Sequence, residues 1–205
     1  AKEGEVTLRV TAKYSRDETE PDIITPVVDE IKARLGDTVY SVENESLEEV
    51  AARLLLKNNI TISIAESCTG GLVSARLTEI PGISKVFNRA IITYSNESKM
   101  ENLGVKAETL EKHGAVSRET ALEMAEGVRK VAGTDIGVSI TGIAGPGGAT
   151  PQKPVGLVFV ALSDGEKSYC RELRLWGDRR RIRNVAAHNV FDMVRRYIAK
   201  LPMNE

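Results

Sequence analysis

Several residue types are scarce in this sequence of 205 residues, and each shortage excludes a class of protein. The chain has two cysteines and two histidines, too few for a disulfide framework and not spaced like the ligands of a structural zinc site. Aromatic residues make up only 4% of the chain, so a folded core must be built from Val, Ile, Leu and Ala. Such a core suits a buried parallel sheet.

Long hydrophobic runs are also missing. No segment approaches the roughly 18 consecutive apolar residues that span a bilayer, and the beginning of the chain carries charges where a signal peptide is apolar. We therefore expect a cytoplasmic protein without membrane contact. Because the first residue is Ala1 rather than Met, we also expect the chain to be processed or to be a fragment of a longer protein.

Charge is unevenly distributed, although the formal net charge is −1. Residues 1–50 carry 6 basic and 13 acidic side chains, for −7, whereas residues 51–205 carry 22 and 16, for +6. This asymmetry predicts two modules, residues 1–43 and residues 44–205. Four arginines almost adjoin in the second module: Arg179, Arg180, Arg181 and Arg183. They indicate either a site for an anion or the solvated face of a helix.

The first module is predicted to be a small α+β unit. Period-2 alternation over residues 6–12 and residues 38–42 predicts two strands, and residues 21–35 form an amphipathic helical pattern between them. The module contains neither a histidine nor a glycine-rich loop. Its acidity argues against a nucleic acid as partner.

The second module alternates helices and strands, which predicts a three-layer α/β/α sandwich. A helix capped by Ser46 opens it and runs to about Asn58. Only Asp164-Gly165-Glu166 separates the last two strands, which predicts a hairpin and therefore a mixed sheet. Strands are expected at 61–65, 87–94, 136–141, 155–163 and 168–173, with further helices at 70–78, 96–103, 117–131 and 178–200.

Three loops lead from a strand into the following segment, and ligands of open α/β sheets bind at this end of the strands. The first loop, AESCTGG, places Ser67 directly after a buried strand. Free amides at the start of the next helix would favour an anion or a developing oxyanion, so Ser67 is a candidate nucleophile. Serine is also a preferred helix cap, and capping would explain the same position.

The second loop, TYSNESK, ends on Lys99. Asn96 is a good helix cap, which places Lys99 at the third helical position, where the helix dipole is unfavourable for a cation. That position and partial burial would lower the pKa of Lys99 and suit it to act as a general base, with Tyr94 holding or relaying the proton. Alternatively, Lys99 extends its amine to solvent.

The third loop, TGIAGPGGA, carries four glycines. Such a backbone can approach a ligand closely and offer amides to a phosphate or a carboxamide. A flexible connection would explain the glycines equally well. The occurrence of three such loops in one sheet nevertheless indicates a functional site.

Six strings occur in the order and at the spacing of one family: AESCTGG, TYSNESK, HGAVS, TGIAGPGG, KPVG and GDRRRIR. Residues 46–200 resemble the CinA C-terminal domain family, the nicotinamide mononucleotide amidohydrolases. Residues 1–43 resemble the KH-like linker module that precedes this domain in full-length CinA proteins. The larger N-terminal domain of those proteins, which is similar to molybdopterin-binding folds and associated with ADP-ribose pyrophosphatase activity, has no counterpart in this sequence.

The resemblance implies hydrolysis of the carboxamide of nicotinamide mononucleotide to nicotinate mononucleotide and ammonia. We expect no metal and no other cofactor, because the loops at the strand ends offer no carboxylate or His/Cys cluster beyond Glu66. The resemblance assigns Ser67 as the nucleophile, with Tyr94 and Lys99 completing a Ser-Tyr-Lys arrangement. The scarcity of histidine agrees, because a Ser-Lys pair can activate a hydroxyl group without one. The substrate would be lined by Thr69, Gly70, Thr141, Gly142, Ala144 and Gly145, with Arg179 or Arg180 at its phosphate.

Other interpretations stay open. A thiol at a helix N-terminus is activated by the same field, so Cys68 is a rival nucleophile. The chain could instead be a regulatory module that binds a nucleotide without turnover. An RNA-binding role of residues 1–43 is the weakest alternative, because they contain no Gly-X-X-Gly loop and are acidic. We expect a homodimer that binds a pyridine mononucleotide.

Overall fold

In the computed structural model of this chain, which describes residues 4–14 and 22–203, five strands form one sheet in the order β2-β1-β3-β4-β5. The parallel pairs are β1 with β2 and β1 with β3, whereas β3 with β4 and β4 with β5 are antiparallel. The mixed sheet and its terminal hairpin are therefore confirmed. The strands are β1 Ile62–Glu66, β2 Phe87–Ile92, β3 Ile136–Gly142, β4 Leu157–Ser163 and β5 Ser168–Arg174.

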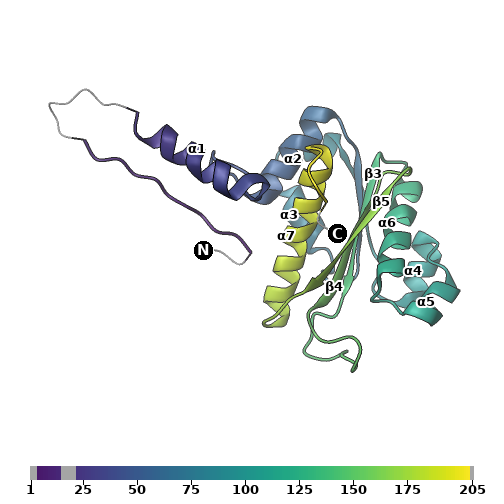
Figure 1. The fold of residues 1–205 in the computed structure, drawn as a ribbon. Helices are drawn as coiled ribbons and strands as arrows, with labels where there is room; N and C mark the ends of the chain where they lie inside the picture. Colours follow the sequence, from purple (N-terminus) through teal and green to yellow (C-terminus); the bar gives the residue numbers. More distant parts are fainter. Residues whose placement is uncertain (1–3, 15–21, 204–205) are drawn as a thin grey trace.

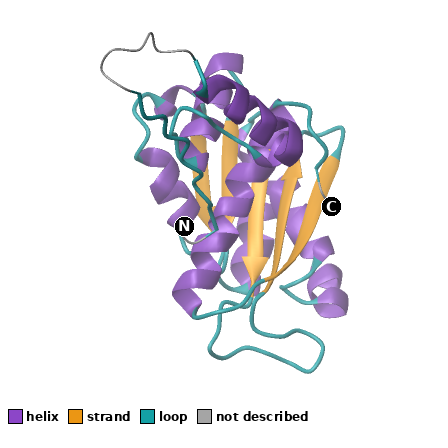
Figure 2. Cartoon of the chain, turned by 60° about the vertical axis from the view of Figure 1, so that its left-hand side comes forward, coloured by secondary structure: helices purple, strands orange, loops and turns teal. Residues whose placement is uncertain are grey.

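Helices cover both faces of the sheet, which confirms the three-layer sandwich (Figures 1 and 2). One face carries α2 Leu47–Asn58, α3 Leu72–Thr78 and α7 Arg179–Ile198. The other carries α4 Asn96–Leu103, α5 Ala107–His113 and α6 Arg118–Ala132. The sequence patterns missed α5, which has only 7 residues. No described helix combines the length and the apolarity needed to cross a membrane.

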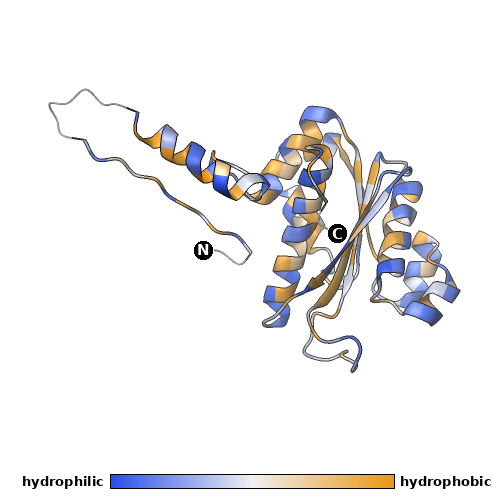
Figure 3. Ribbon diagram, in the orientation of Figure 1, coloured by the Kyte–Doolittle hydropathy of each residue, from blue (hydrophilic) through white to orange (hydrophobic). Residues whose placement is uncertain are grey.

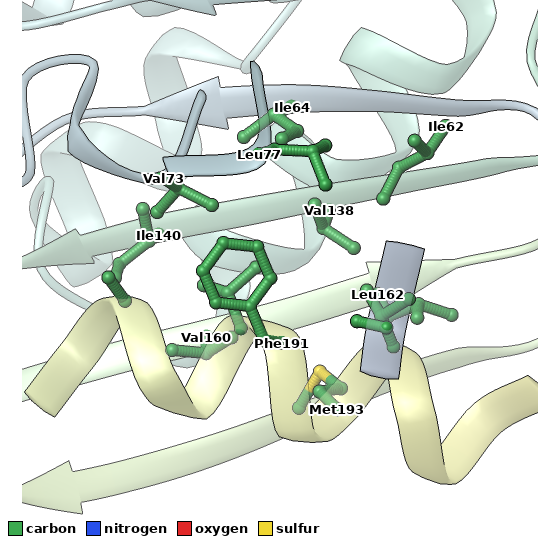
Figure 4. Close-up of a cluster of buried hydrophobic side chains, with 14 of the residues drawn as sticks. Ile62, Ile64, Val73, Leu77, Val138, Ile140, Val160, Leu162, Phe191 and Met193 are labelled. Carbon is green, nitrogen blue, oxygen red and sulfur yellow. The ribbon is translucent and has the colours of Figure 1, made fainter. Parts of the chain in front are cut away.

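The core between the sheet and α7 is aliphatic, as the low aromatic content predicts. Apolar side chains of β1, β3 and β4 face the helices, and Figure 3 shows this concentration of hydrophobic residues along the strands. Phe191 of α7 packs among Ile140, Val160 and Val73 (Figure 4). This packing fixes α7 against the strands whose ends carry the three loops.

The strands predicted in the first module are wrong. Residues 6–12 and 38–42 form no strand, and Val6 and Leu8 are 75% and 58% exposed. A strand needs hydrogen bonds from a neighbouring strand, and alternation of apolar residues supplies none by itself. The helix predicted at residues 21–35 is present as α1, Ile24–Leu35. Its expected first residue, 21, lies outside the described residues. Figure 1 shows α1 projecting from the sandwich.

Charged side chains join the first module to α7. The Arg196 guanidinium pairs with the carboxylate of Asp37, and Arg195 Nη2 donates to the Asp37 carbonyl at 3.0 Å. Asp192 accepts hydrogen bonds from both arginines. Because both guanidinium groups are buried, these partners are needed to offset the cost of removing the charges from water.

The turn from β1 into α3 is fixed by the buried carboxylate of Glu66, which is 0% exposed. The amides of Gly71, Val73 and Ser74 donate to it at 3.0, 3.2 and 2.9 Å, and the Ser74 hydroxyl donates at 2.6 Å. Gly71 is the N-cap residue of α3 and has no side chain that could cap the helix. Glu66 therefore supplies the cap from the preceding strand.

A glycine allows α6 to lie against the end of α4. A Cβ atom at Gly127 would lie 2.0 Å from the carbonyl oxygen of Leu103. That oxygen belongs to the last residue of α4, the helix that carries Lys99. The small size of Gly127 thus sets how closely α6 approaches the end of the helix that carries Lys99.

We predict that Glu66→Gln destabilises the protein by about 2 kcal/mol or more, because one carboxylate oxygen becomes an amide donor that faces buried donors. The free energy of unfolding in urea measures the effect. Glu79→Gln is the matched control, since Glu79 is exposed at the other end of α3. Equal stabilities of the two variants would contradict the capping role of Glu66.

We also predict that Gly127→Ala lowers stability, although alanine is normally favoured in a helix by about 1 kcal/mol. The added methyl group collides with a backbone carbonyl that cannot rotate away, and overpacking typically costs about 1–3 kcal/mol. Thermal unfolding measures the sign. Gly147→Ala is the control, because its Cβ would have no atom within 4 Å. Stabilisation by Gly127→Ala would show that α4 and α6 are less tightly packed.

Candidate active site

Ser67 and Lys99 meet at the carboxyl ends of β1 and β2. The Lys99 amine lies 3.3 Å from Ser67 Oγ, and the two side chains are buried, with exposed fractions of 8% for Ser67 and 1% for Lys99. The Ser67 amide donates to the carbonyl of Ile140 in β3 at 3.0 Å. The turn that carries the serine is therefore attached to the neighbouring strand as well as to α3.

Lys99 lies one position further into its helix than the sequence predicts. The N-cap of α4 is Ser95, whose hydroxyl accepts from the Ser98 amide at 3.1 Å. The expected cap, Asn96, is instead the first helical residue. Both residue types are good caps, so composition could not decide between adjacent positions. Lys99 consequently stands at the fourth helical position, pointing back toward the end of β2.

The Lys99 amine is surrounded by backbone carbonyls rather than by carboxylates. It donates to the carbonyl of Thr93 at 2.8 Å and lies 3.4 Å from those of Tyr94 and Ser95. In the described part of the chain it forms no ion pair. Burial lowers the pKa of Lys99, against smaller raising effects from Cys68 and Glu97. A neutral amine can keep its N–H groups on the carbonyls and turn its lone pair toward the Ser67 hydroxyl.

Two alternative roles of the first loop are disfavoured by its geometry. Ser67 is not the cap of α3, because that position belongs to Gly71. Cys68 is buried, and its burial raises the pKa of the thiol to about 12. A thiolate is therefore disfavoured at neutral pH, and the hydroxyl of Ser67 is the better candidate nucleophile.

The amides available to a ligand differ from those that the sequence suggests. The first amides of α3 are not free, because Glu66 accepts from them. Those of Gly70 and Leu72 donate to the Ser67 and Thr69 carbonyls. Among the described residues, no hydrogen bond joins the amides of Cys68 and Thr69 to another residue, although the Cys68 amide contacts the sulfur of its own side chain. These two groups directly follow the candidate nucleophile, where donors of an oxyanion hole are found in serine hydrolases.

The third loop approaches this site from β3. The Thr141 hydroxyl donates to the Ala115 carbonyl at 2.8 Å, and Ala144 is buried. A Cβ at Gly142 would lie 2.6 Å from a methyl group of Val158, so this glycine is required by packing. Gly145 lies further out, and its carbonyl accepts from Arg179 at 2.9 Å.

Tyr94 lies at the mouth of the site, with 62% of its surface exposed. Its hydroxyl is 3.1 Å from Arg179 Nη2, and no hydrogen bond in the described chain joins it to Ser67 or Lys99. Arg179 thus bridges the second and third loops. Arg180, the adjacent candidate, is exposed and is turned about 100° away around α7.

Two basic residues, Arg183 and Lys153, belong to the sequence strings that carry the family resemblance but were not among the expected site residues. Arg183 donates to the Thr69 carbonyl, beside Gly70. The sequence feature that could have pointed to Arg183 is its spacing of four residues from Arg179, which puts both side chains on one face of the helix. Lys153 donates to the carbonyls of His113 and Val116 at 2.5 and 2.7 Å. The lysine therefore ties the segment after the glycines to the loop before α6.

One group outside the site has the proximity of metal ligands. Glu5, Glu48 and His188 bring their donor atoms within 4.8 Å of one another in the described part of the chain. Arg76 Nη2 donates to both Glu48 oxygens, at 2.8 and 2.9 Å, and lies 3.2 Å from His188 Nδ1. A guanidinium thus already supplies the positive charge at this group.

Two family models match the chain. The CinA C-terminal domain matches residues 44–198, and the damage-inducible protein CinA KH domain matches residues 1–41. A competence-damage inducible protein of Acetivibrio thermocellus is 63% identical over 201 residues, or 98% of this chain and 49% of that protein. A CinA-like protein of Kosmotoga olearia is 55% identical over 203 residues, or 99% of this chain and 49% of that protein. The chain thus spans about half the length of these relatives.

Solved structures share the fold. A competence/damage inducible protein of Agrobacterium tumefaciens has a TM-score of 0.69 and 41% identity, covering 73% of this chain and 94% of that one. A CinA superfamily protein of Klebsiella pneumoniae has a TM-score of 0.73 and 31% identity, covering 76% of this chain and 99% of that one. Together with the match over residues 44–198, these similarities establish that the chain belongs to the CinA family.

Proposed function

We propose that this chain hydrolyses the carboxamide of nicotinamide mononucleotide to nicotinate mononucleotide and ammonia. The observation that carries the proposal is the buried Lys99 amine, 3.3 Å from Ser67 Oγ and without an acidic partner in the described chain. Membership in the CinA family supports a hydrolase-related role. The substrate is taken from the resemblance of the six sequence strings to the amidohydrolases of that family.

In the first step, neutral Lys99 accepts the proton of the Ser67 hydroxyl as Oγ attacks the carboxamide carbon. Burial of the amine lowers its pKa and so raises the fraction of neutral Lys99 that can act as the base. The developing oxyanion accepts hydrogen bonds from the Cys68 and Thr69 amides. Glu66 supports these donors, because its hydrogen bonds hold the end of the same turn.

In the second step, protonated Lys99 returns its proton to the leaving nitrogen, and ammonia departs from an acyl ester on Ser67. Water then attacks the ester while Lys99 accepts a proton from it, and Lys99 returns that proton to Ser67 Oγ as the ester bond breaks and nicotinate mononucleotide is released. The sum is one carboxamide and one water converted to one carboxylic acid and one ammonia, which together are a carboxylate and an ammonium ion in water. Tyr94 is retained in the proposal as the third residue of the Ser-Tyr-Lys arrangement, and its hydroxyl would act at the mouth beside Arg179.

Residues 1–43 and 44–205 remain two modules in this proposal, and the chemistry is assigned to the second. A regulatory module that binds the nucleotide without turnover would use the same loops but would not need a buried neutral lysine beside a hydroxyl. Release of ammonia from nicotinamide mononucleotide by the purified chain separates the two functions directly.

We predict that Ser67→Ala abolishes ammonia release, with a fall in kcat of about 10³-fold or more, because the nucleophile is lost. Cys68→Ala should keep most of the turnover, since a thiol with a pKa of about 12 contributes no thiolate. A coupled ammonia assay measures both variants, and a chelator should leave the wild-type rate unchanged. The reverse pattern, with activity lost only in Cys68→Ala, would assign the reaction to the thiol.

We further predict that kcat/KM rises with pH through the pKa of Lys99, which lies below its ordinary value of 10.5 because the amine is buried. Below that pKa the amine is protonated and cannot accept the serine proton, so the acidic limb of the profile belongs to Lys99. Lys99→Arg should lower kcat by about 10²-fold or more, because arginine cannot deprotonate in a protein.

Lys112→Arg is the matched control, because Lys112 is exposed on α5. It should leave both the rate and the pH profile unchanged. Near-normal kcat in Lys99→Arg, with only KM raised, would mean that Lys99 binds the substrate and that the base lies elsewhere.

A further inference from the structure

The first turns of α7 present two arginines to the mouth of the site. Arg179 and Arg183 are four residues apart and therefore lie on one face of the helix. Arg179 contacts the carbonyl of Gly145, and Arg183 contacts that of Thr69. The face between them spans from the third loop to the turn that carries Ser67.

The two arginines are held differently. Arg179 has its terminal nitrogens engaged on both sides, by the Gly145 carbonyl and the Tyr94 hydroxyl. Arg183 makes one hydrogen bond, from Nη2 to the Thr69 carbonyl, while its buried Nε has no partner among the described residues. The buried Nε of Arg181 lacks a partner too, but that guanidinium lies over the Trp176 ring and not beside the Ser67 turn. The buried hydroxyl oxygen of Thr69 also lacks a partner. Polar atoms of this kind are rarely left unpaired in proteins, so an additional ligand oxygen near Arg183 would be favourable.

Neither Arg179 nor Arg183 forms an ion pair with a carboxylate in the described part of the chain, whereas Arg171, Arg195 and Arg196 are all paired with Asp192. The N-terminus of α7 is itself capped by the Asp178 carboxylate, which accepts from the Arg181 amide at 2.7 Å. The positive charge available to a ligand here therefore comes from the two guanidinium groups. The geometry thus concentrates positive charge beside the Ser67 turn.

We infer that Arg183 binds the phosphate of the substrate and makes the site selective for a ribose 5′-phosphate over the free riboside. The inference rests on the proposed function, because it takes the carboxamide to lie at Ser67. A guanidinium presents several N–H groups in one plane and can bind two oxygens of a phosphomonoester at once. In this assignment Arg179 positions the second and third loops, and Arg183 recognises the anion.

The test compares nicotinamide mononucleotide with nicotinamide riboside, which has the same carboxamide and no phosphate. Arg183→Gln should lower kcat/KM for the mononucleotide at least about tenfold, through KM, and leave that for the riboside nearly unchanged. Arg183→Lys, which keeps the charge but not the planar fork, should lose less. Arg181→Gln is the matched control, since the Arg181 guanidinium lies over the Trp176 ring, 4.0 Å from its centroid.

Other outcomes would overturn the inference. Equal losses for both substrates in Arg183→Gln would mean that the residue only supports the Ser67 turn through the Thr69 carbonyl. A phosphate-selective loss in Arg180→Gln and not in Arg183→Gln would assign the phosphate to Arg180. If the wild-type chain releases ammonia from neither substrate, the proposed function fails, and calorimetric binding of the mononucleotide to wild type and Arg183→Gln then tests the phosphate site alone: equal affinities would refute it.

Discussion

The buried carboxylate of Glu66 determines how the chain leaves β1. Its two oxygens accept four hydrogen bonds from the start of α3. The residues between Glu66 and α3 therefore have little conformational freedom. The negative charge and the positive end of the helix stabilise each other, which makes a fully buried carboxylate tolerable. The same arrangement leaves the amides of Cys68 and Thr69 for a ligand, next to the hydroxyl that is proposed to react.

The site separates its cations by burial. Lys99 is enclosed by carbonyls and held where an amine favours its neutral form, while Arg179 and Arg183 stand at the mouth, where a guanidinium stays charged. The lysine amine can therefore exchange protons, while the two guanidinium groups attract an anion. Gly127 lets α6 lie close against the end of α4, the helix that carries Lys99.

Sequence patterns predicted structural features that depend on residues close together in the chain, and they missed features that depend on residues far apart. Alternation predicted the five strands of the sheet and the hairpin, and position at strand ends pointed to Ser67 and Lys99 as candidates. The strand expected at residues 6–12 failed because its partner could not be deduced from alternation. The capping role of Glu66 was invisible because its acceptor oxygens serve residues up to eight positions later. Arg183 lies in a run of similar arginines, and the contacts of α7 distinguish it from its neighbours.

The arginines at the two ends of α7 contact different parts of the protein. Its first turns face the candidate active site, and its last turns hold Asp37 of the first module through Arg195 and Arg196. With 20 residues, α7 is about 30 Å long. The first module and the candidate active site are therefore anchored to one continuous helix, at opposite ends of its axis.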